Sequence, residues 1–171
     1  MKNFGKVHSA QTFLLEAHIV DVEVDISKGF YAFTIVGLPD KAVEESRDRM
    51  SAAIKHSGFK SPKSHNQKTV VSLAPANLKK EGPSFDVPIA LAYLIAKEEI
   101  DFNPEKKIFV GELSLDGKIR KISGVLPLIE KAERIGFEEA YVPLENAEEA
   151  ALIKNIKVFP VETLQDLIEH L

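Results

Sequence analysis

The chain has 171 residues, an ordinary hydrophobic content of 44% and a formal net charge of -4. The absence of cysteine excludes disulfides, thiolate metal sites and cysteine nucleophiles. The longest apolar stretch, around ALAYLIA, is shorter than the roughly 20 residues of a bilayer span, and the N-terminus has no apolar signal core. We therefore expect a cytoplasmic protein. The five histidines have neither i, i+4 nor HExxH spacing, so we expect no histidine metal site.

In the first half of the chain, residues 18–27 and 33–39 are expected to form the two strands of a β-hairpin, and residues 40–57 a helix. A loop over residues 60–67 and a buried strand over residues 69–75 should follow. Asp40 is placed to be the N-cap of the helix, and Glu45 and Arg49 are spaced for a solvated i, i+4 ion pair within it.

The second half is expected to begin with an apolar helix after EGPS and a hairpin around Asp116-Gly117. A helix over residues 124–136, a strand over 139–143, a short helix over 145–153 and a strand over 156–161 should follow. Pro127 falls in the first turn of its helix, and Thr163 with Asp166 resembles a capping arrangement for a final helix. Helices and strands alternate but two hairpins interrupt them, which predicts an α+β, or mixed α/β, class.

Charge is unevenly distributed along the sequence. No Asp or Glu lies between Arg49 and Lys80, whereas acidic residues dominate beyond residue 130. Such asymmetry indicates either an anionic partner or a solvated surface without a ligand. If DNA is the partner, contacts should go to phosphates and binding should be weak and sequence-independent. The candidate nucleic-acid-binding residues are Lys55, Lys60, Lys63, Lys68, Lys79 and Lys80.

The stretch KKEGPSFDVP places Ser84 at the start of an apolar helix. There a hydroxyl can be a nucleophile if a base lies within reach, or it can cap the helix. In the second case Asp86 adds charge that suits the helix dipole, and Pro88 lies in the first turn. No segment has the P-loop spacing G-x-x-x-x-G-K-[ST], so this chain is not expected to hydrolyse ATP or to hold a cofactor.

EGPS with its apolar helix, then GELSLDGKI and a glycine-led helix ending at Gly136, resemble the proteolytic domain of the Lon proteases, which use a Ser-Lys dyad. The resemblance implies a fold like that of the second domain of ribosomal protein S5. Ser84 matches the nucleophile, but counting without gaps from Gly111 places Leu126 at the position of the lysine. Lys131 lies more than a helical turn further on and on a different face. The dyad is therefore expected to be broken, and Ser84 to act as a helix cap.

Nearly the whole chain resembles the N-terminal domain of the Mg-chelatase-like YifB/ComM proteins, through VGLPD, ESR, LAPANLKKEGPSFDVP and GELSLDGKIRKISGVLP. The resemblance implies one Lon-like domain over residues 1–171, followed in that family by an AAA+ ATPase module that is absent from this chain. ATP and Mg are expected only in that module. It also implies DNA remodelling, such as branch migration during natural transformation, and a homo-oligomeric, hexameric ring with this domain as its collar. RadA-type recombination proteins carry a similar non-proteolytic domain, associated with hexamer formation and DNA binding.

Two alternatives stay open at this point. The first is a serine peptidase in which Ser84 is activated by Lys79, Lys80 or Lys121. The second is a standalone domain that binds RNA or protein and shares only the fold. The missing lysine at Leu126 argues against the peptidase, whereas nothing in the sequence separates the standalone domain from the assembly module.

Overall fold

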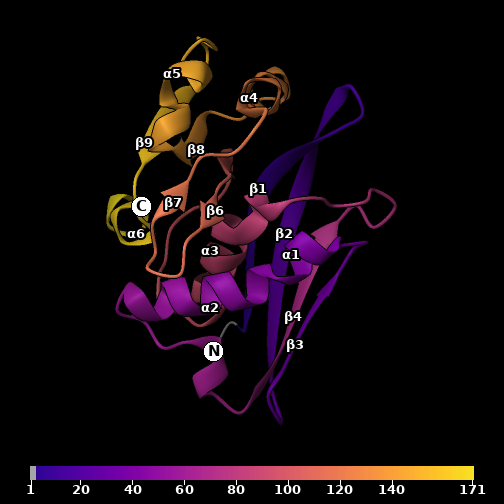
Figure 1. Cartoon of the computed structure of the whole chain (residues 1–171), viewed down its shortest axis with the longest axis vertical. Helices are drawn as coiled ribbons and strands as arrows, with labels where there is room; N and C mark the ends of the chain where they lie inside the picture. The colour runs from indigo at the N-terminus through magenta and orange to yellow at the C-terminus, as the bar shows by residue number, and fades with distance from the viewer. Residues whose placement is uncertain (1–2) are drawn as a thin grey trace.

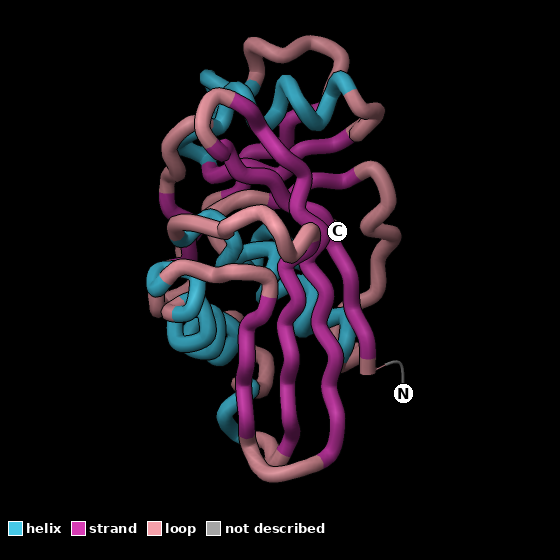
Figure 2. Tube along the Cα trace, turned by 90° about the vertical axis from the view of Figure 1, so that its right-hand side faces the viewer, coloured by secondary structure: helices cyan, strands magenta, loops and turns pink. Residues whose placement is uncertain are grey.

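The computed structural model describes residues 3–171. Seven strands form a mixed sheet in the order β3-β4-β2-β1-β5-β8-β9, and β6 and β7 form a separate hairpin (Figures 1 and 2). The strands are β1 Phe4–Phe13, β2 Glu16–Lys28, β3 Ala32–Val36, β4 Gln67–Ala74, β5 Lys107–Phe109, β6 Glu112–Leu113, β7 Ile119–Arg120, β8 Glu139–Pro143 and β9 Lys157–Val161.

Helices cover both faces of the sheet and bury two apolar cores. The α-helices are α1 Lys41–Glu44, α2 Ser46–His56, α3 Asp86–Ala96, α4 Val125–Arg134, α5 Ala147–Ala150 and α6 Leu164–His170, and the 3-10 helices are η1 Pro62–Ser64, η2 Pro83–Phe85 and η3 Leu144–Asn146. The larger core takes side chains from α2, α3 and α6, including Met50, Leu91 and Leu164. The smaller core takes Val125 of α4 and Ala150 of α5. This arrangement confirms the mixed α/β class.

The predicted hairpin between residues 18–27 and 33–39 is wrong. β2 pairs antiparallel with β1 and with β4, whereas β3 pairs parallel with β4 at the edge of the sheet. Val71 and Leu73 of β4 are fully buried, whereas the residues of β3 are half-buried or exposed. β4 therefore lies inside the sheet next to β2, and β3 lies at the edge. The helices α1 and α2 supply the crossover that a parallel β3–β4 pair requires.

The long first strand was not predicted. The alternating segment before Asp116-Gly117, expected as one hairpin strand, is divided into β5, which pairs with β1 and β8, and β6, which pairs with β7. β1 passes so close to α3 that a Cβ atom on Gly5 would lie 2.1 Å from the carbonyl oxygen of Ala92. A glycine in a strand interior is typical of such a close approach. Within residues 3–171, no helix is both long and apolar enough to cross a membrane.

Most other local predictions are confirmed. Asp40 caps α1, although the expected helix over 40–57 is divided into α1 and α2. β6 and β7 form the hairpin around Asp116-Gly117, and Gly117 has a positive φ of 92°. The side chain of Thr163 accepts from the backbone N–H of Asp166 and caps α6.

Candidate functional site

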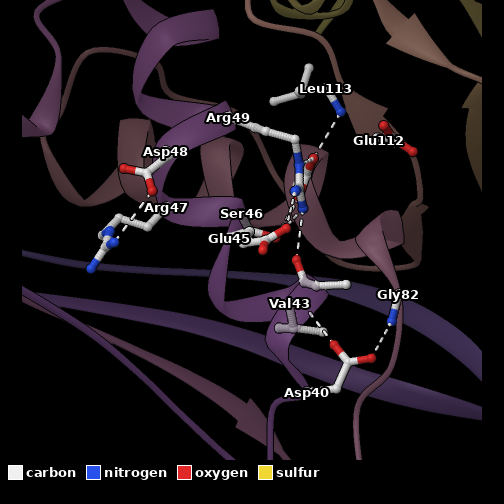
Figure 3. A network of polar contacts seen from close by, with 12 residues as sticks. Asp40, Val43, Glu45, Ser46, Arg47, Asp48, Arg49, Gly82, Glu112 and Leu113 are labelled. Carbon is white, nitrogen blue, oxygen red and sulfur yellow. Dashed lines mark hydrogen bonds and ion pairs between the residues drawn. The ribbon is translucent and has the colours of Figure 1, made fainter.

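Asp86, the first residue of α3, is fully buried and accepts hydrogen bonds from four donors. Arg49 of α2 donates from Nε to Oδ2 at 2.6 Å and from Nη2 to Oδ1 at 3.0 Å. Ser46 Oγ donates to Oδ1, and the backbone N–H of Leu113 donates to Oδ2 at 3.0 Å. Figure 3 shows these donors converging from α2 and from β6. We call this group, Asp86 with Arg49, Ser46 and the Leu113 N–H, the Asp86 junction.

Arg49 has a second role besides the one that its spacing predicted. The i, i+4 pair with Glu45 exists at 3.7 Å, but the shorter contacts of Arg49 go to Asp86 and, at 2.8 Å, to the carbonyl oxygen of Ala42. Its side chain is only 19% exposed. The expected i, i+4 pair is therefore present, but Arg49 is mostly buried, and through Asp86 and Ala42 it also links α1, α2 and α3. Asp86 lies in the first turn of α3, as expected, but it is a fully buried hydrogen-bond acceptor.

The ion pair changes the proton affinity of both of its members. The hydrogen bond to Asp86 raises the pKa of Arg49, so the guanidinium stays charged. Burial raises the pKa of Asp86, while the donors Arg49, Ser46 and Leu113 act against that rise. Because a buried charge is expensive without its partners, the junction holds its elements together only while all of its members are present.

Asp40 joins two of the motifs that are far apart in the sequence. Its Oδ1 accepts from the Val43 N–H at 2.8 Å, and its Oδ2 accepts from the Gly82 N–H at 3.1 Å (Figure 3). Lys80 adds backbone hydrogen bonds to Leu38 and Asp40, each of 2.9 Å. The residues of VGLPD are thus fixed to the EGPS turn, which positions Ser84.

Ser84 does not cap α3, so the capping prediction is wrong. It lies inside the turn η2, and the residue before α3 is Phe85, which has helical backbone angles and no side-chain capping bond. An N-cap residue needs an extended conformation to direct its side chain at the following N–H groups. Pro88 does lie in the first turn, as expected.

A pocket of about 260 Å³ lies beside Ser84. Ser84 is half-buried in its wall, and Lys121, which is exposed, lines the same pocket. Glu81 and Glu112 contribute two carboxylates, and Leu128 of α4 contributes an apolar surface. Of the three lysines named as alternative bases, Lys121 is the one that shares this pocket with Ser84. We call this the Ser84 pocket.

Leu126, at the position of the dyad lysine, does not line the Ser84 pocket. Its side chain is half-buried, and its backbone N–H donates to Glu149 Oε1 at 3.2 Å. Lys79 is exposed and pairs with Glu81 at 2.8 Å. The side chain of Gln11, which sequence reasoning missed, bonds the carbonyl oxygen of Lys79 and the N–H of Glu81 and so fixes the turn below the pocket.

Lys80 is fully buried, and its Nζ donates to the carbonyl oxygen of Pro75. Burial lowers the pKa of Lys80. Because the ammonium group is enclosed, it cannot reach a phosphate in this conformation, which corrects its assignment as a nucleic-acid-binding residue. Its neighbours Lys79 and Glu81 are charged and exposed, so the local sequence gave no sign of this burial, which depends on how the chain folds back on the turn at Pro75.

The other candidate lysines do not form one surface. Lys55, Lys60 and Lys68 are exposed, but exposed Lys63 pairs with Asp48 at 2.7 Å. Lys68 lies at the start of β4, whose eight residues span roughly 25 Å, and Lys79 follows the opposite end of the strand.

At the start of β4 the structure adds two lysines that the sequence analysis did not include. Lys28 pairs in register with Gln67, and Lys97 Nζ donates to Gln67 Oε1 at 3.4 Å. Lys28, Lys97 and His65 line a pocket of about 230 Å³. We call Lys28, Lys60, Lys68, Lys97 and His65 the lysine end of the sheet.

The pKa of His65 responds to the positive charges of the lysine end. Burial lowers this pKa, and the charges of Lys97 and Lys60 lower it further, while the charge of Glu99 acts against them. The Nε2 atom of His65 is buried and has no hydrogen-bond partner among residues 3–171. Lys28, Lys60 and Lys68 take part in no ion pair within residues 3–171, so their charge is available to an anion. In the same part of the chain, no group of three or more His, Asp or Glu side chains is arranged to hold a metal ion.

The family model "Subunit ChlI of Mg-chelatase" matches residues 22–146. The chain is 38% identical over 166 residues to the competence protein ComM of Haemophilus influenzae and 39% identical over 166 residues to the protein YifB of Salmonella typhimurium. Each alignment covers 96% of this chain but 32% of the relative, so the chain spans about a third of their length. A weaker match, 33% identical over 92 residues, covers 54% of the chain and 22% of the DNA repair protein RadA of Streptococcus pneumoniae.

Proposed function

Because the chain belongs to the ChlI-type Mg-chelatase family together with ComM and YifB, we propose that it is a non-proteolytic module that contributes DNA contact and subunit assembly to a DNA-remodelling ATPase. ATP and Mg belong to the AAA+ module of the family, outside these residues. The names of a competence protein and a DNA repair protein among the relatives support a DNA substrate. We propose further that the protein assembles into a homo-oligomeric, hexameric ring in the cytoplasm, as the family resemblance implies.

The observation that carries the DNA contact is the lysine end. Four lysines come from three separate parts of the chain and surround a histidine whose pKa is lowered by burial and by two of these lysines. Like charges placed together repel one another, and an anion bound among them relieves this repulsion. A phosphate backbone supplies such anions at regular spacing, and binding to it needs no base reading.

The non-proteolytic part of the proposal rests on where the motif residues lie. Asp40, Ser46, Arg49 and Asp86 are all engaged in the Asp86 junction or in the Asp40 contacts beside it. Leu126 offers no amine to Ser84, and an inactive hydroxyl needs an adjacent base to become a nucleophile. The motifs that define the resemblance therefore serve the architecture around the Ser84 pocket.

DNA contact is tested by fluorescence anisotropy with a labelled duplex oligonucleotide at low salt. We expect the triple variant Lys28→Glu/Lys60→Glu/Lys68→Glu to bind at least about tenfold more weakly than wild type, and three lost phosphate contacts to change the slope of log K against log salt by about 2.7. The matched control is Lys118→Glu/Lys131→Glu/Lys154→Glu, which changes the net charge equally at exposed sites elsewhere. Equal losses in the two variants would mean that only net charge matters and would contradict the proposal.

One observation favours a second function, a serine peptidase. Lys121 shares the Ser84 pocket, so a base could approach the hydroxyl from a different element than in the Lon dyad. Cleavage of casein that disappears in both Ser84→Ala and Lys121→Met, with folding intact, would favour this function. We expect no cleavage by wild type.

A further inference from the structure

The two edges of the sheet are protected to different degrees. The edge strand β9 contains Lys157 and Pro160, and both residue types hinder the addition of another strand. The opposite edge strand, β3, has the sequence AFTIV, with no charged residue and no proline. An edge strand without such protection is typical of a site that pairs with another chain.

The surroundings of β3 are those of a docking surface. Val36 is 42% exposed and Leu38 is 55% exposed, and Phe30, before the strand, is 95% exposed. A pocket of about 380 Å³ runs beside the strand. Its lining residues are Phe33, Thr34, Ile35, Lys41, Glu44, Glu45 and Arg47, from β3 on one side and from α1 and α2 on the other.

The charges along this pocket fit a second copy of the same surface. Its helical wall carries two basic residues, Lys41 and Arg47, and two acidic residues, Glu44 and Glu45. A two-fold axis brings a patch against itself, so a patch with balanced charges can place each cation near an anion of the other copy. A strongly basic or acidic partner would gain nothing from such a neutral wall.

We propose that β3 pairs antiparallel with β3 of a second copy, centred on Thr34, to form one continuous sheet through two chains. In this register Thr34 faces Thr34 of the second copy, Phe33 faces its Ile35, and Ala32 faces its Val36. Phe33 and Ile35, which are only partly buried against the larger core, then gain apolar neighbours. A two-fold pair closes at the dimer, so this contact is separate from the heterologous interface that the ring proposed above requires, and it does not depend on the DNA contact.

The absence of cysteine makes the pairing directly testable in the 171-residue chain. Directly opposed residues of antiparallel strands have Cα atoms about 4.5–5.5 Å apart, within the roughly 4.4–6.8 Å that a disulfide spans. We expect Thr34→Cys to form a disulfide-linked dimer under mild oxidation at least about tenfold faster than the control Leu152→Cys, whose site is 63% exposed and follows α5. A mixture of Ala32→Cys and Val36→Cys should form the mixed dimer in preference to either self-linked dimer.

Sedimentation velocity supplies the second measurement, without any oxidation. Wild type should show a monomer–dimer equilibrium, and Thr34→Lys should raise its dissociation constant at least about tenfold because two lysines would lie directly opposite each other. Lys41→Glu and Glu44→Lys should each weaken the dimer, and an equimolar mixture of the two should restore it. A wild-type monomer up to millimolar concentration, open-ended association beyond the dimer, or Thr34→Cys linkage no faster than the control would each overturn the proposal. DNA binding that fails while the dimer persists would leave this inference standing.

Discussion

The Asp86 junction and the Ser84 pocket begin two residues apart on the same turn and yet have opposite chemistry. Asp86 is fully buried and accepts from four donors, whereas Ser84 is half-buried in the wall of a pocket of about 260 Å³. The junction takes its residues from the most distinctive motifs of the sequence. In this protein the distinctive residues maintain the fold, and the serine that resembles a nucleophile has no such support.

The difference follows from what each environment demands of its residues. A carboxylate removed from water must keep its donors, so Arg49 and Ser46 cannot vary independently of Asp86. A half-exposed hydroxyl can exchange protein partners for water at little cost. We therefore expect substitutions in the two regions to have very different effects.

The largest effect is expected for Asp86→Ala. It leaves the Arg49 guanidinium in a mostly buried site without its carboxylate, and breaking one partner of a buried ion pair costs about 3–5 kcal/mol of unfolding free energy. Urea unfolding followed by circular dichroism measures the loss. Glu45→Ala, which removes the longer and exposed contact of Arg49, is the control and should cost less than about 1 kcal/mol. Similar losses in the two variants would remove the special role of the junction.

A smaller effect is expected for Asp40→Ala, because it removes one capping bond and the bond to Gly82. Loss of an N-cap side chain costs about 0.5–2 kcal/mol. Asp40→Asn keeps an acceptor oxygen for Val43 and should retain most of this stability. Thermal unfolding of the two variants checks the order. If the asparagine variant were as unstable as the alanine variant, the charge of Asp40 or its bond to Gly82, and not the capping bond to Val43, would be responsible.

The contrast also explains what could be predicted from the sequence. The Asp40 cap and the turn at Gly117 depend on neighbours within a few residues, so they could be predicted. The pairing of Arg49 with Asp86 depends on how α2 and α3 pack, and no local pattern encodes that. The lysine end likewise brings together Lys28 and Lys97, which lie outside the acid-free segment of the sequence.

Lys80 is buried like Asp86, but it has no carboxylate partner within residues 3–171. It therefore shows the effect of burial on a charged group without that of an ion pair. Burial lowers the pKa of Lys80 below its usual 10.5. At pH values between the lowered pKa of the folded chain and the ordinary pKa of 10.5, the unfolded chain binds more protons at Lys80 than the folded chain. The contribution of Lys80 to stability therefore rises as the pH increases through this range.

Lys80→Met removes this titration and keeps most of the apolar volume. We expect the stability of wild type relative to Lys80→Met to improve as the pH is raised from neutral towards 10.5. Unfolding free energies of both proteins along this pH series give the difference, in which the other lysines cancel. A difference that does not change with pH would mean that the ammonium group keeps its ordinary proton affinity in the folded chain.

The smallest effect is expected for Ser84→Ala, on the other side of the comparison. Its hydroxyl makes no capping bond to either η2 or α3, so the free energy of unfolding should change by less than about 0.5 kcal/mol. The matched variant is Ser46→Ala, which removes a donor to the buried Asp86 carboxylate and should cost about 1–3 kcal/mol. Both changes remove one hydroxyl, so the difference in their unfolding curves measures the environment alone. Equal losses would mean that Ser84 has a structural partner after all, and the pocket would then belong to the same supporting network as the junction.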